Sequence, residues 1–262
     1  MINPWIWIRN VIRVRSKKSL LGKIIRELHA DYSKKIVHLV SATRHDESVF
    51  WHSSALGKSL INYRDIKNLK INIHYSNTLG LPAIYNEYIK SVSSSDILLF
   101  IHDDIWLDDP DWLHKTLKAL EQYDIVGIAG NVRFGPFQPG WIFKAIVNGQ
   151  FVWDTGYLSG TVAHGKYGNG KKNNYGPTPM ECKVIDGLFI AARCSYLRRG
   201  RVMFDERFKF HFYDLDFCRS ANKAGLTIGT WPIALTHQSG GAYGTPLWQE
   251  SYSSYLAKWS NG

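Results

Sequence analysis

The chain has 262 residues, of which 45% are hydrophobic and 21% are charged. This is the composition of a globular protein with a full-sized hydrophobic core, and it excludes an intrinsically disordered chain. The three cysteines, Cys182, Cys194 and Cys218, form no CxxC pair and no metal-ligand spacing. Because their count is odd and no secretion signal is recognisable, we expect reduced thiols in a cytosolic compartment.

The net charge of +10 is concentrated in residues 1–35, where nine Lys or Arg face two acids and give +7. Arg9 and Arg13 interrupt the apolar residues of this extension, which therefore reads as neither a signal peptide nor a membrane-spanning helix. Two interpretations stay open. Residues 1–30 lie as a basic amphipathic helix on an anionic membrane surface, or they pack on the domain with a solvated basic face. The main body has no nucleic-acid-binding motif, so no nucleic-acid partner is expected.

The first half of the remaining chain alternates between strand and helix patterns. The expected elements are strands at 36–40, 69–75, 97–101 and 125–129, with helices at 83–91 and 110–123. The run 97–101 is apolar throughout, as in a strand that is buried on both faces. This alternation predicts an α/β fold with a mainly parallel sheet flanked by helices.

The second half is less regular, and we assign it to the same domain. Strands are expected at 151–155, 183–192 and 227–236, and a helix from Asp214 to the C′ residue Gly225. Residues 164–179 are rich in Gly, Asn and Lys, which predicts a polar loop. The predicted organisation is thus an extension, 1–35, followed by a single domain, 36–262.

A cluster of polar residues, His102, Asp103 and Asp104, follows the apolar strand 97–101 directly. Ligands of α/β proteins bind at the carboxyl ends of such strands. Two adjacent carboxylates repel each other, so this position favours a hard divalent cation. A helix-capping role is less favoured because Asp109 before Pro110 already fits the cap of the next helix.

A second acidic pair, Asp214 and Asp216, lies at the start of the helix expected near residue 214. Residues two apart on a helix do not share a face, so at most one of these carboxylates should point into a cleft. An acid at a helix start is also a common cap, and that interpretation remains open for this pair.

Taken in order, these segments resemble family 2 and related inverting glycosyltransferases of the GT-A fold over residues 36–245. The matching segments are 36–40, 77–80 with Asn86, the acidic motif at 98–104, 184–193, and 204–225. The chain departs from the family pattern at two positions. His102 stands where the first acid of the Asp-x-Asp motif is usual, and Tyr213 replaces the usual Glu before the catalytic aspartate.

The resemblance implies roles for individual residues. Asp104 and His237 are the implied metal ligands, with Mn²⁺ or Mg²⁺ as the cofactor. Asp214 is the implied catalytic base, and Asp216 is the reserve base or an orienting acid. The other implied contacts are to the nucleotide sugar, from Ser41, Arg44, Asn77, Asn86, His102 and Asp103, and to the acceptor, from Asp186, Gly187 and Tyr213.

Structural interpretations remain open for two of these residues. Asp186 before Gly187 is a common turn pair, and His237 at a strand end can simply bond to the backbone.

The implied function is metal-dependent, inverting transfer of a sugar from a nucleoside-diphosphate sugar to a hydroxyl of a glycan or lipid-linked saccharide. By analogy with the family, the pathway is bacterial surface polysaccharide or lipopolysaccharide synthesis, in the cytoplasm or peripherally at the inner face of the plasma membrane. The alternatives are a nucleotidyltransferase and an inactive, carbohydrate-binding relic of the fold. Residues 41–47 lack the glycine-rich phosphate loop that a nucleotidyltransferase needs, which counts against the first alternative.

Overall fold

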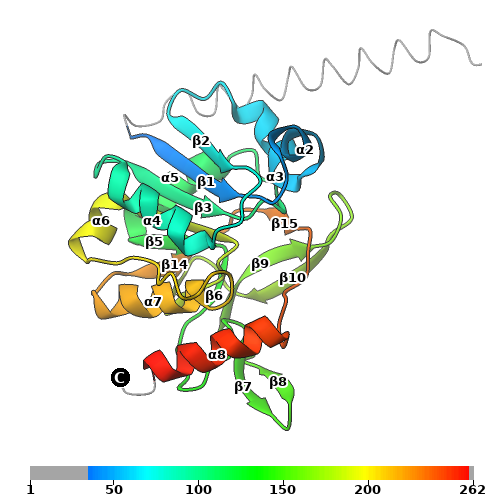
Figure 1. The fold of residues 1–262 in the computed structure, drawn as a ribbon, viewed down its shortest axis with the longest axis vertical. Coiled ribbons are helices and arrows are strands. Elements are labelled where there is room, and N and C mark those ends of the chain that lie inside the picture. The colour runs from blue at the N-terminus through cyan, green and yellow to red at the C-terminus, as the bar shows by residue number, and fades with distance from the viewer. Residues whose placement is uncertain (1–34, 260–262) are drawn as a thin grey trace, which may run out of the picture.

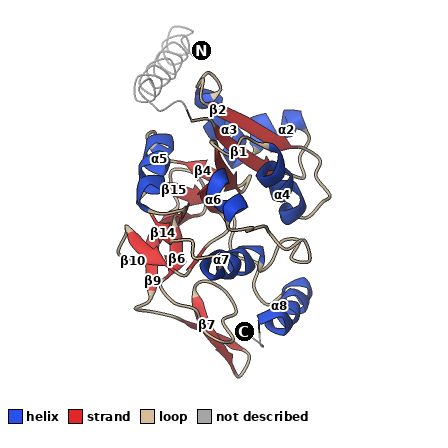
Figure 2. Ribbon diagram, turned by 90° about the vertical axis from the view of Figure 1, so that its left-hand side faces the viewer, coloured by secondary structure: helices blue, strands red, loops and turns tan. Residues whose placement is uncertain are grey.

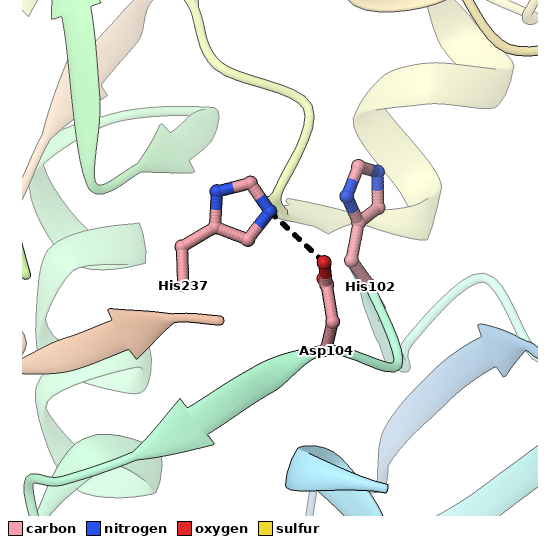
Figure 3. A group of neighbouring side chains, drawn as sticks. All are labelled: His102, Asp104 and His237. Atoms are coloured by element: carbon pink, nitrogen blue, oxygen red, sulfur yellow. Dashed lines mark ion pairs between the residues drawn. The ribbon is translucent and has the colours of Figure 1, made fainter. Parts of the chain in front are cut away.

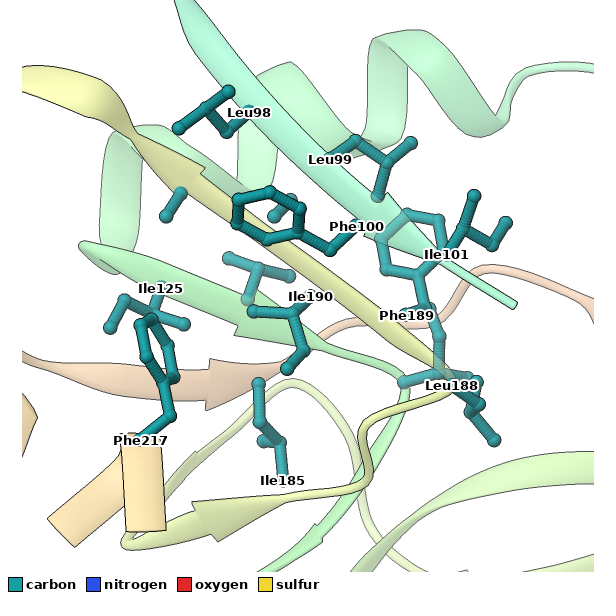
Figure 4. Close-up of a cluster of buried hydrophobic side chains, with 14 of the residues drawn as sticks. Leu98, Leu99, Phe100, Ile101, Ile125, Ile185, Leu188, Phe189, Ile190 and Phe217 are labelled. Atoms are coloured by element: carbon teal, nitrogen blue, oxygen red, sulfur yellow. The ribbon is translucent and has the colours of Figure 1, made fainter. Parts of the chain in front are cut away.

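The apolar run 97–101 forms the central strand β3 (Ile97–Ile101), whose five side chains are each at most 1% exposed. A computed structural model describes residues 35–259, and β3 runs through the hydrophobic core of this part (Figure 4). Each large apolar side chain buried this fully contributes roughly 1.5–3 kcal/mol to folding. The expectation of a strand buried on both faces is confirmed.

The first of two main sheets has seven strands in the order β11-β14-β5-β13-β3-β1-β2. Besides β3, they are β1 (Val37–Ala42), β2 (Leu69–His74), β5 (Ile125–Gly127), β11 (Met180–Cys182), β13 (Phe189–Arg193) and β14 (Ile228–Thr230). The strands β1, β2, β3, β5 and β14 run in one direction, and β11 and β13 run against them. The mainly parallel sheet is therefore confirmed.

Helices flank this sheet, and Figures 1 and 2 show α4 and α5 on opposite faces. The described helices are α2 (Glu47–Ser53), α3 (Ala55–Leu60), α4 (Leu81–Ser91), α5 (Trp112–Gln122), α6 (Cys194–Arg199), α7 (Tyr213–Lys223) and α8 (Pro246–Trp259), with a 3₁₀ turn at Ile61–Tyr63. On α4, Tyr85 stacks against Phe100 of β3 with ring centroids 4.4 Å apart. Aromatic packing of this kind fixes the helix to the sheet.

The helix expected at 110–123 begins at Trp112, two residues late. Asp109, the expected N-cap, instead accepts a hydrogen bond from the Asp111 N–H (3.0 Å) and pairs with the Lys115 ammonium (2.6 Å). Asp111 takes the N-cap position and makes no side-chain capping bond. The predicted N-cap was wrong because the Asp109 carboxylate accepts its hydrogen bond within the turn through Pro110, from the Asp111 N–H, and the helix begins after Asp111.

A second sheet was not expected from the sequence. Its path is β12-β6-β9-β15-β4, and β10 pairs with β9 at its side. These strands are β4 (Ile105–Leu107), β6 (Ala129–Asn131), β9 (Leu158–His164), β10 (Lys171–Gly176), β12 (Val184–Ile185) and β15 (Leu235–His237). The segment 164–179, expected to be a loop, therefore contributes strand β10, which pairs in antiparallel register with β9.

At four of the places where the chain passes between the two sheets, the connecting residues form what we call the seam: residues 102–104, 128, 186–188 and 231–234. Each place separates a strand of the first sheet from a strand of the second. The single strands expected at 125–129, 183–192 and 227–236 are consequently split into β5 and β6, β12 and β13, and β14 and β15. The seam gives the fold two sheets where periodicity alone predicted one.

A hairpin of β7 (Phe143–Val147) and β8 (Gln150–Trp153) projects from the molecule below α8 in Figure 1. Helix α8 packs beside α7, where Tyr252 and Tyr255 stack on Phe212 with centroids 5.4 and 5.1 Å away. The Lys258 ammonium near its end pairs with the buried carboxylate of Asp216 at 2.6 Å. These contacts fix the start of α7 from its outer side.

The predicted amphipathic extension and its membrane interpretation lie outside the described residues, apart from Lys35. Between residues 35 and 259, no helix combines the length and apolar character needed to cross a bilayer.

Candidate active site

A cavity of about 730 Å³ opens at the carboxyl ends of β1 and β3, where the seam residues 102–104 and 186–187 line it. Ligand sites of open α/β sheets lie at this edge. Eight of the residues singled out from the sequence line the cavity: His102, Asp103, Asp104, Asp186, Gly187, Tyr213, Asp214 and His237. Among the described residues, neither Lys nor Arg contributes to its lining.

Three side chains at one end of the cavity, His102, Asp104 and His237, place one ligand atom each within 4.8 Å of one another. Figure 3 shows the two imidazoles on either side of the Asp104 carboxylate. His237 Nε2 lies 3.2 Å from Asp104 Oδ2, while Asp104 Oδ1 is buried and has no hydrogen-bond partner. We call these residues the His–Asp–His cluster. An unpartnered buried carboxylate oxygen is costly unless something else binds it.

Strand pairing brings the cluster together from distant parts of the sequence. In the second sheet His237 of β15 lies opposite Ile105 of β4, the residue after Asp104. The Gln238 N–H also donates to the Asp104 carbonyl oxygen at 2.9 Å. His237 was predicted as a ligand from the resemblance, whereas His102 was assigned to the nucleotide sugar. The structure places His102 beside the other two.

The ionisation states of the cluster follow from burial and charge. Burial opposes ionisation of Asp104, but the hydrogen bond and charge of His237 outweigh it and hold the Asp104 pKa well below its usual range. Burial lowers the pKa of His102 to about 4, so its imidazole is neutral at physiological pH. A charged carboxylate and a neutral imidazole are the forms that bind metals.

Tyr213 connects His102 to the seam. Its hydroxyl donates to the Gly187 carbonyl oxygen at 2.9 Å, and the same oxygen lies 2.7 Å from His102 Nε2. A carbonyl can only accept, so the single hydroxyl proton is used there and the Nε2 proton must come from His102. This assigns the proton of the neutral imidazole to Nε2 and leaves the lone pair on Nδ1.

Asp214 lies at the start of α7, and its two carboxylate oxygens accept hydrogen bonds from the N–H groups of Gly187 (3.0 Å) and Leu215 (2.9 Å). Burial and the neighbouring Asp186 charge raise its pKa to about 7. Burial also raises the pKa of Asp186. A carboxylate with a pKa near 7 is well matched to proton transfer at neutral pH.

The backbone at this helix start is unusual. Phe212 has φ +66°, in the left-handed region that non-glycine residues rarely adopt. At Gly187 a Cβ would lie 2.2 Å from the Tyr213 hydroxyl oxygen, so no side chain fits there. Together the two residues let α7 begin with Tyr213 and Asp214 directed at the seam.

Of the remaining residues that were assigned to the nucleotide sugar, one lines the cavity and the others do not. Asp103 lines the cavity. Burial raises the pKa of its carboxyl, and this effect outweighs a hydrogen bond with Thr43 that acts in the opposite direction. Arg44 is exposed beyond β1, and the side chain of Asn77 folds onto Leu79. Neither of these two lines the cavity.

Two further candidates are buried away from the cavity. Ser41 is fully buried within β1. Asn86 donates to the Phe204 carbonyl and the Glu206 carboxylate and accepts from the Phe204 N–H. Its hydrogen-bonding capacity is thus used to clamp the segment before α7, which does not fit direct binding of a nucleotide sugar.

The reserve base Asp216 is fully buried on the far side of α7. Lys258 Nζ and Trp259 Nε1 bind one of its carboxylate oxygens at 2.6 and 2.9 Å. It does not line the cavity, and its place does not fit a base. The expectation that only one acid of the pair faces a cleft is confirmed.

The sequence did not single out the aromatic side of the cavity. We call this side, formed by Trp141, Phe143, Trp153, Tyr175 and Tyr243, the aromatic wall. A high content of Trp and Tyr was the sole signal for it, and composition does not tell which rings converge.

The sequence profile described as "Glycosyltransferase like family" matches residues 45–239, and a search of curated proteins found no match. Among solved structures, residues 1–349 of TarS from S. aureus share 14% identity at a TM-score of 0.46, covering 85% of this chain and 64% of that one. The same fragment is also known in complex with UDP.

The mannosyltransferase PcManGT from Pyrobaculum calidifontis, in complex with GDP-mannose and Mn²⁺, shares 11% identity at a TM-score of 0.45, covering 97% and 73% of the two chains. Likenesses this distant assign no substrate. The family profile, in contrast, spans most of the folded chain, from the residues after β1 to those after β15. The resemblance seen in the sequence is thus confirmed, and the protein belongs to the glycosyltransferase-like family.

Proposed function

We propose that the protein is a metal-dependent, inverting glycosyltransferase that moves a sugar from a nucleoside-diphosphate sugar to a hydroxyl of a glycan or lipid-linked saccharide. The observation that carries the proposal is the presence of the His–Asp–His cluster and Asp214 in one cavity. The first offers a cation site for a leaving diphosphate, and the second offers a base for an attacking hydroxyl.

The residues present fit a divalent cation. The cluster supplies two imidazoles and a carboxylate whose Oδ1 lacks a partner, and no Lys or Arg of the described chain lines the cavity. Neutralisation of a diphosphate there would thus depend on a metal. A set with two imidazoles suits Mn²⁺ better than Mg²⁺, which prefers oxygen ligands. When bound, the ion would supply positive charge to the leaving diphosphate.

Asp214 is the proposed base. Its ionised carboxylate takes the proton of the acceptor hydroxyl as the oxygen attacks the anomeric carbon from the side opposite the leaving group. One displacement inverts that carbon, so no nucleophile of the enzyme is needed. The N–H groups of Gly187 and Leu215 orient the carboxylate, and the nearby charge of Asp186 strengthens it as a base.

Replacement of the two acids separates binding from chemistry. We expect Asp104→Ala to abolish Mn²⁺-dependent binding of UDP and GDP in titration calorimetry. Asp214→Asn should keep that binding and lower transfer or hydrolysis of UDP- and GDP-sugars by about 10²–10⁴-fold. Asp46→Asn, at the exposed N-cap of α2, is the control and should change neither. Unchanged turnover in both cavity variants would refute the mechanism, and nucleotide binding without any turnover in the wild type would favour the inactive relic.

The pH profile tests the Asp214 assignment. Below its pKa of about 7 the base is protonated, so kcat/KM should fall about tenfold per pH unit on the acid side. The Asp186 charge raises that pKa, so Asp186→Asn should move the acid limb to lower pH, whereas Asp186→Glu should leave it in place. An acid limb that ignores the charge at residue 186 would contradict the assignment.

Tyr213 is the proposed positioning residue for the metal. Its hydroxyl keeps the Nδ1 lone pair of His102 available, and such outer partners typically contribute 10–100-fold to metal affinity. Tyr213→Phe keeps the ring and should weaken Mn²⁺ binding by about that factor in electron paramagnetic resonance titrations. The matched control is Tyr88→Phe, which removes a similar hydroxyl, 3.0 Å from His74 Nε2, outside the cavity. Equal Mn²⁺ affinity in the two variants would exclude the role.

The proposal extends to the place of action, which we take to be the inner face of the plasma membrane, in synthesis of bacterial surface polysaccharide or lipopolysaccharide. Its support is the basic, apolar extension 1–30 in the sequence. The full chain should float with anionic liposomes, less so at high salt, and a chain lacking residues 1–30 should not. Equal flotation of the two chains would remove the membrane argument.

A further inference from the structure

The aromatic wall is the largest feature of the cavity that the proposed reaction leaves without a role. Trp153 of β8 lines the cavity and is 47% exposed. Neighbouring rings hold it in place. Phe143, its cross-strand partner, packs edge-on against it at 5.8 Å, and the Tyr175 ring lies within 25° of parallel at 6.4 Å. A large, preorganised and exposed ring is a typical anchor for a binding partner.

The wall lies beside the proposed base. Trp141 lines the cavity with Asp186 and lowers the pKa of that carboxyl, and its ring meets Tyr175 edge to face at 5.0 Å. Asp186 precedes Gly187, whose N–H donates to Asp214. A path of direct contacts and one peptide link therefore runs from the exposed Trp153 through Tyr175 and Trp141 to the residues that would activate the acceptor.

The chemistry of this side favours a neutral ligand. The cavity lining in the described chain lacks Lys and Arg, so a phosphate-bearing acceptor would find no cation along the wall. Polar partners are present instead, since Asn173 lies two residues before Tyr175 on the same face of β10 and also lines the cavity. Flat aromatic rings edged by amide and carboxylate groups match a pyranose. Its C–H face is apolar, and its hydroxyls require hydrogen-bond partners.

We propose that the aromatic wall is the acceptor subsite, and that it binds a neutral pyranose of the acceptor through the face of Trp153. The assignment to the acceptor rests on the proposed function, because it takes Asp214 as the base. The pyranose presents a hydroxyl toward Asp186 and Asp214, while its apolar face covers the Trp153 ring. Acceptor choice in this protein is then set by the β7–β8 hairpin that carries the ring.

Saturation-transfer NMR on the full chain tests this subsite without turnover. The probes are the methyl glycosides of glucose, galactose and mannose, with glycerol 1-phosphate as the anionic, non-pyranose probe. At least one glycoside should receive saturation from the wild type. Trp153→Ala should weaken it about tenfold or more, and Trp153→Phe should restore part of it. Phe137→Ala is the matched control, because Phe137 is 61% exposed and lies outside the cavity lining.

The proposal is overturned if no glycoside binds the wild type, if Trp153→Ala binds the glycoside as well as the wild type does, or if glycerol 1-phosphate alone is bound. Displacement of the glycoside by UDP-glucose or GDP-mannose would assign the wall to the donor sugar and equally overturn it. Mn²⁺-dependent UDP or GDP binding, measured on the same samples, should be unchanged in Trp153→Ala. Failure of that binding in the wild type would count against the proposed function and leave the saccharide result standing.

Discussion

The seam between the two sheets is the constraint on which the site depends. Where the chain leaves one sheet and has not yet entered the next, its backbone groups need other partners, and they find them across the seam. The His102 N–H binds the Leu188 carbonyl, and the Asp186 N–H binds the Ala129 carbonyl. Strand alternation is interrupted there, so His102, Asp103 and Asp104 all line the same cavity, which neighbours in a regular strand would not do.

Collecting acids at one seam creates an electrostatic problem that the structure resolves unevenly. Asp104, Asp186 and Asp214 line one cavity. Asp104 lies 3.2 Å from the imidazole of His237, whereas Asp186 and Asp214 accept hydrogen bonds from backbone N–H groups. Asp104 consequently stays ionised, while burial raises the pKa values of Asp186 and Asp214. In a buried environment this difference in pKa between the carboxyl groups is large, because solvent screens their charges only weakly. The end of the cavity at Asp104 is thereby suited to binding a cation, and the end at Asp214 is suited to accepting a proton.

Much of the fold could be read from local sequence, and most of the remainder depends on distant partners. The strand 97–101 and the acids after it are contiguous, so the local sequence was sufficient to predict the strand and the position of the acids at its end. The splitting of 183–192 at Asp186–Leu188 was not readable, because it depends on β6 and β3 pairing with its two parts. The contacts of Asn86 were not readable for a similar reason, since its partners Phe204 and Glu206 lie more than a hundred residues away. The two departures from the family motif, His102 and Tyr213, looked independent in sequence, yet they bond each other at 2.7 Å.

That bond shows how one helix start can govern both halves of the site. Tyr213 reaches the His–Asp–His cluster through His102, and both Tyr213 and its neighbour Asp214 bond the backbone of Gly187. Their direction is set by Phe212, whose left-handed backbone costs roughly 1–3 kcal/mol. Stacking of Tyr252 and Tyr255 on its ring offsets that cost from the outside. Helix α8, which carries none of the proposed reacting groups, therefore helps to hold the proposed metal ligands and the proposed base in one fixed relation.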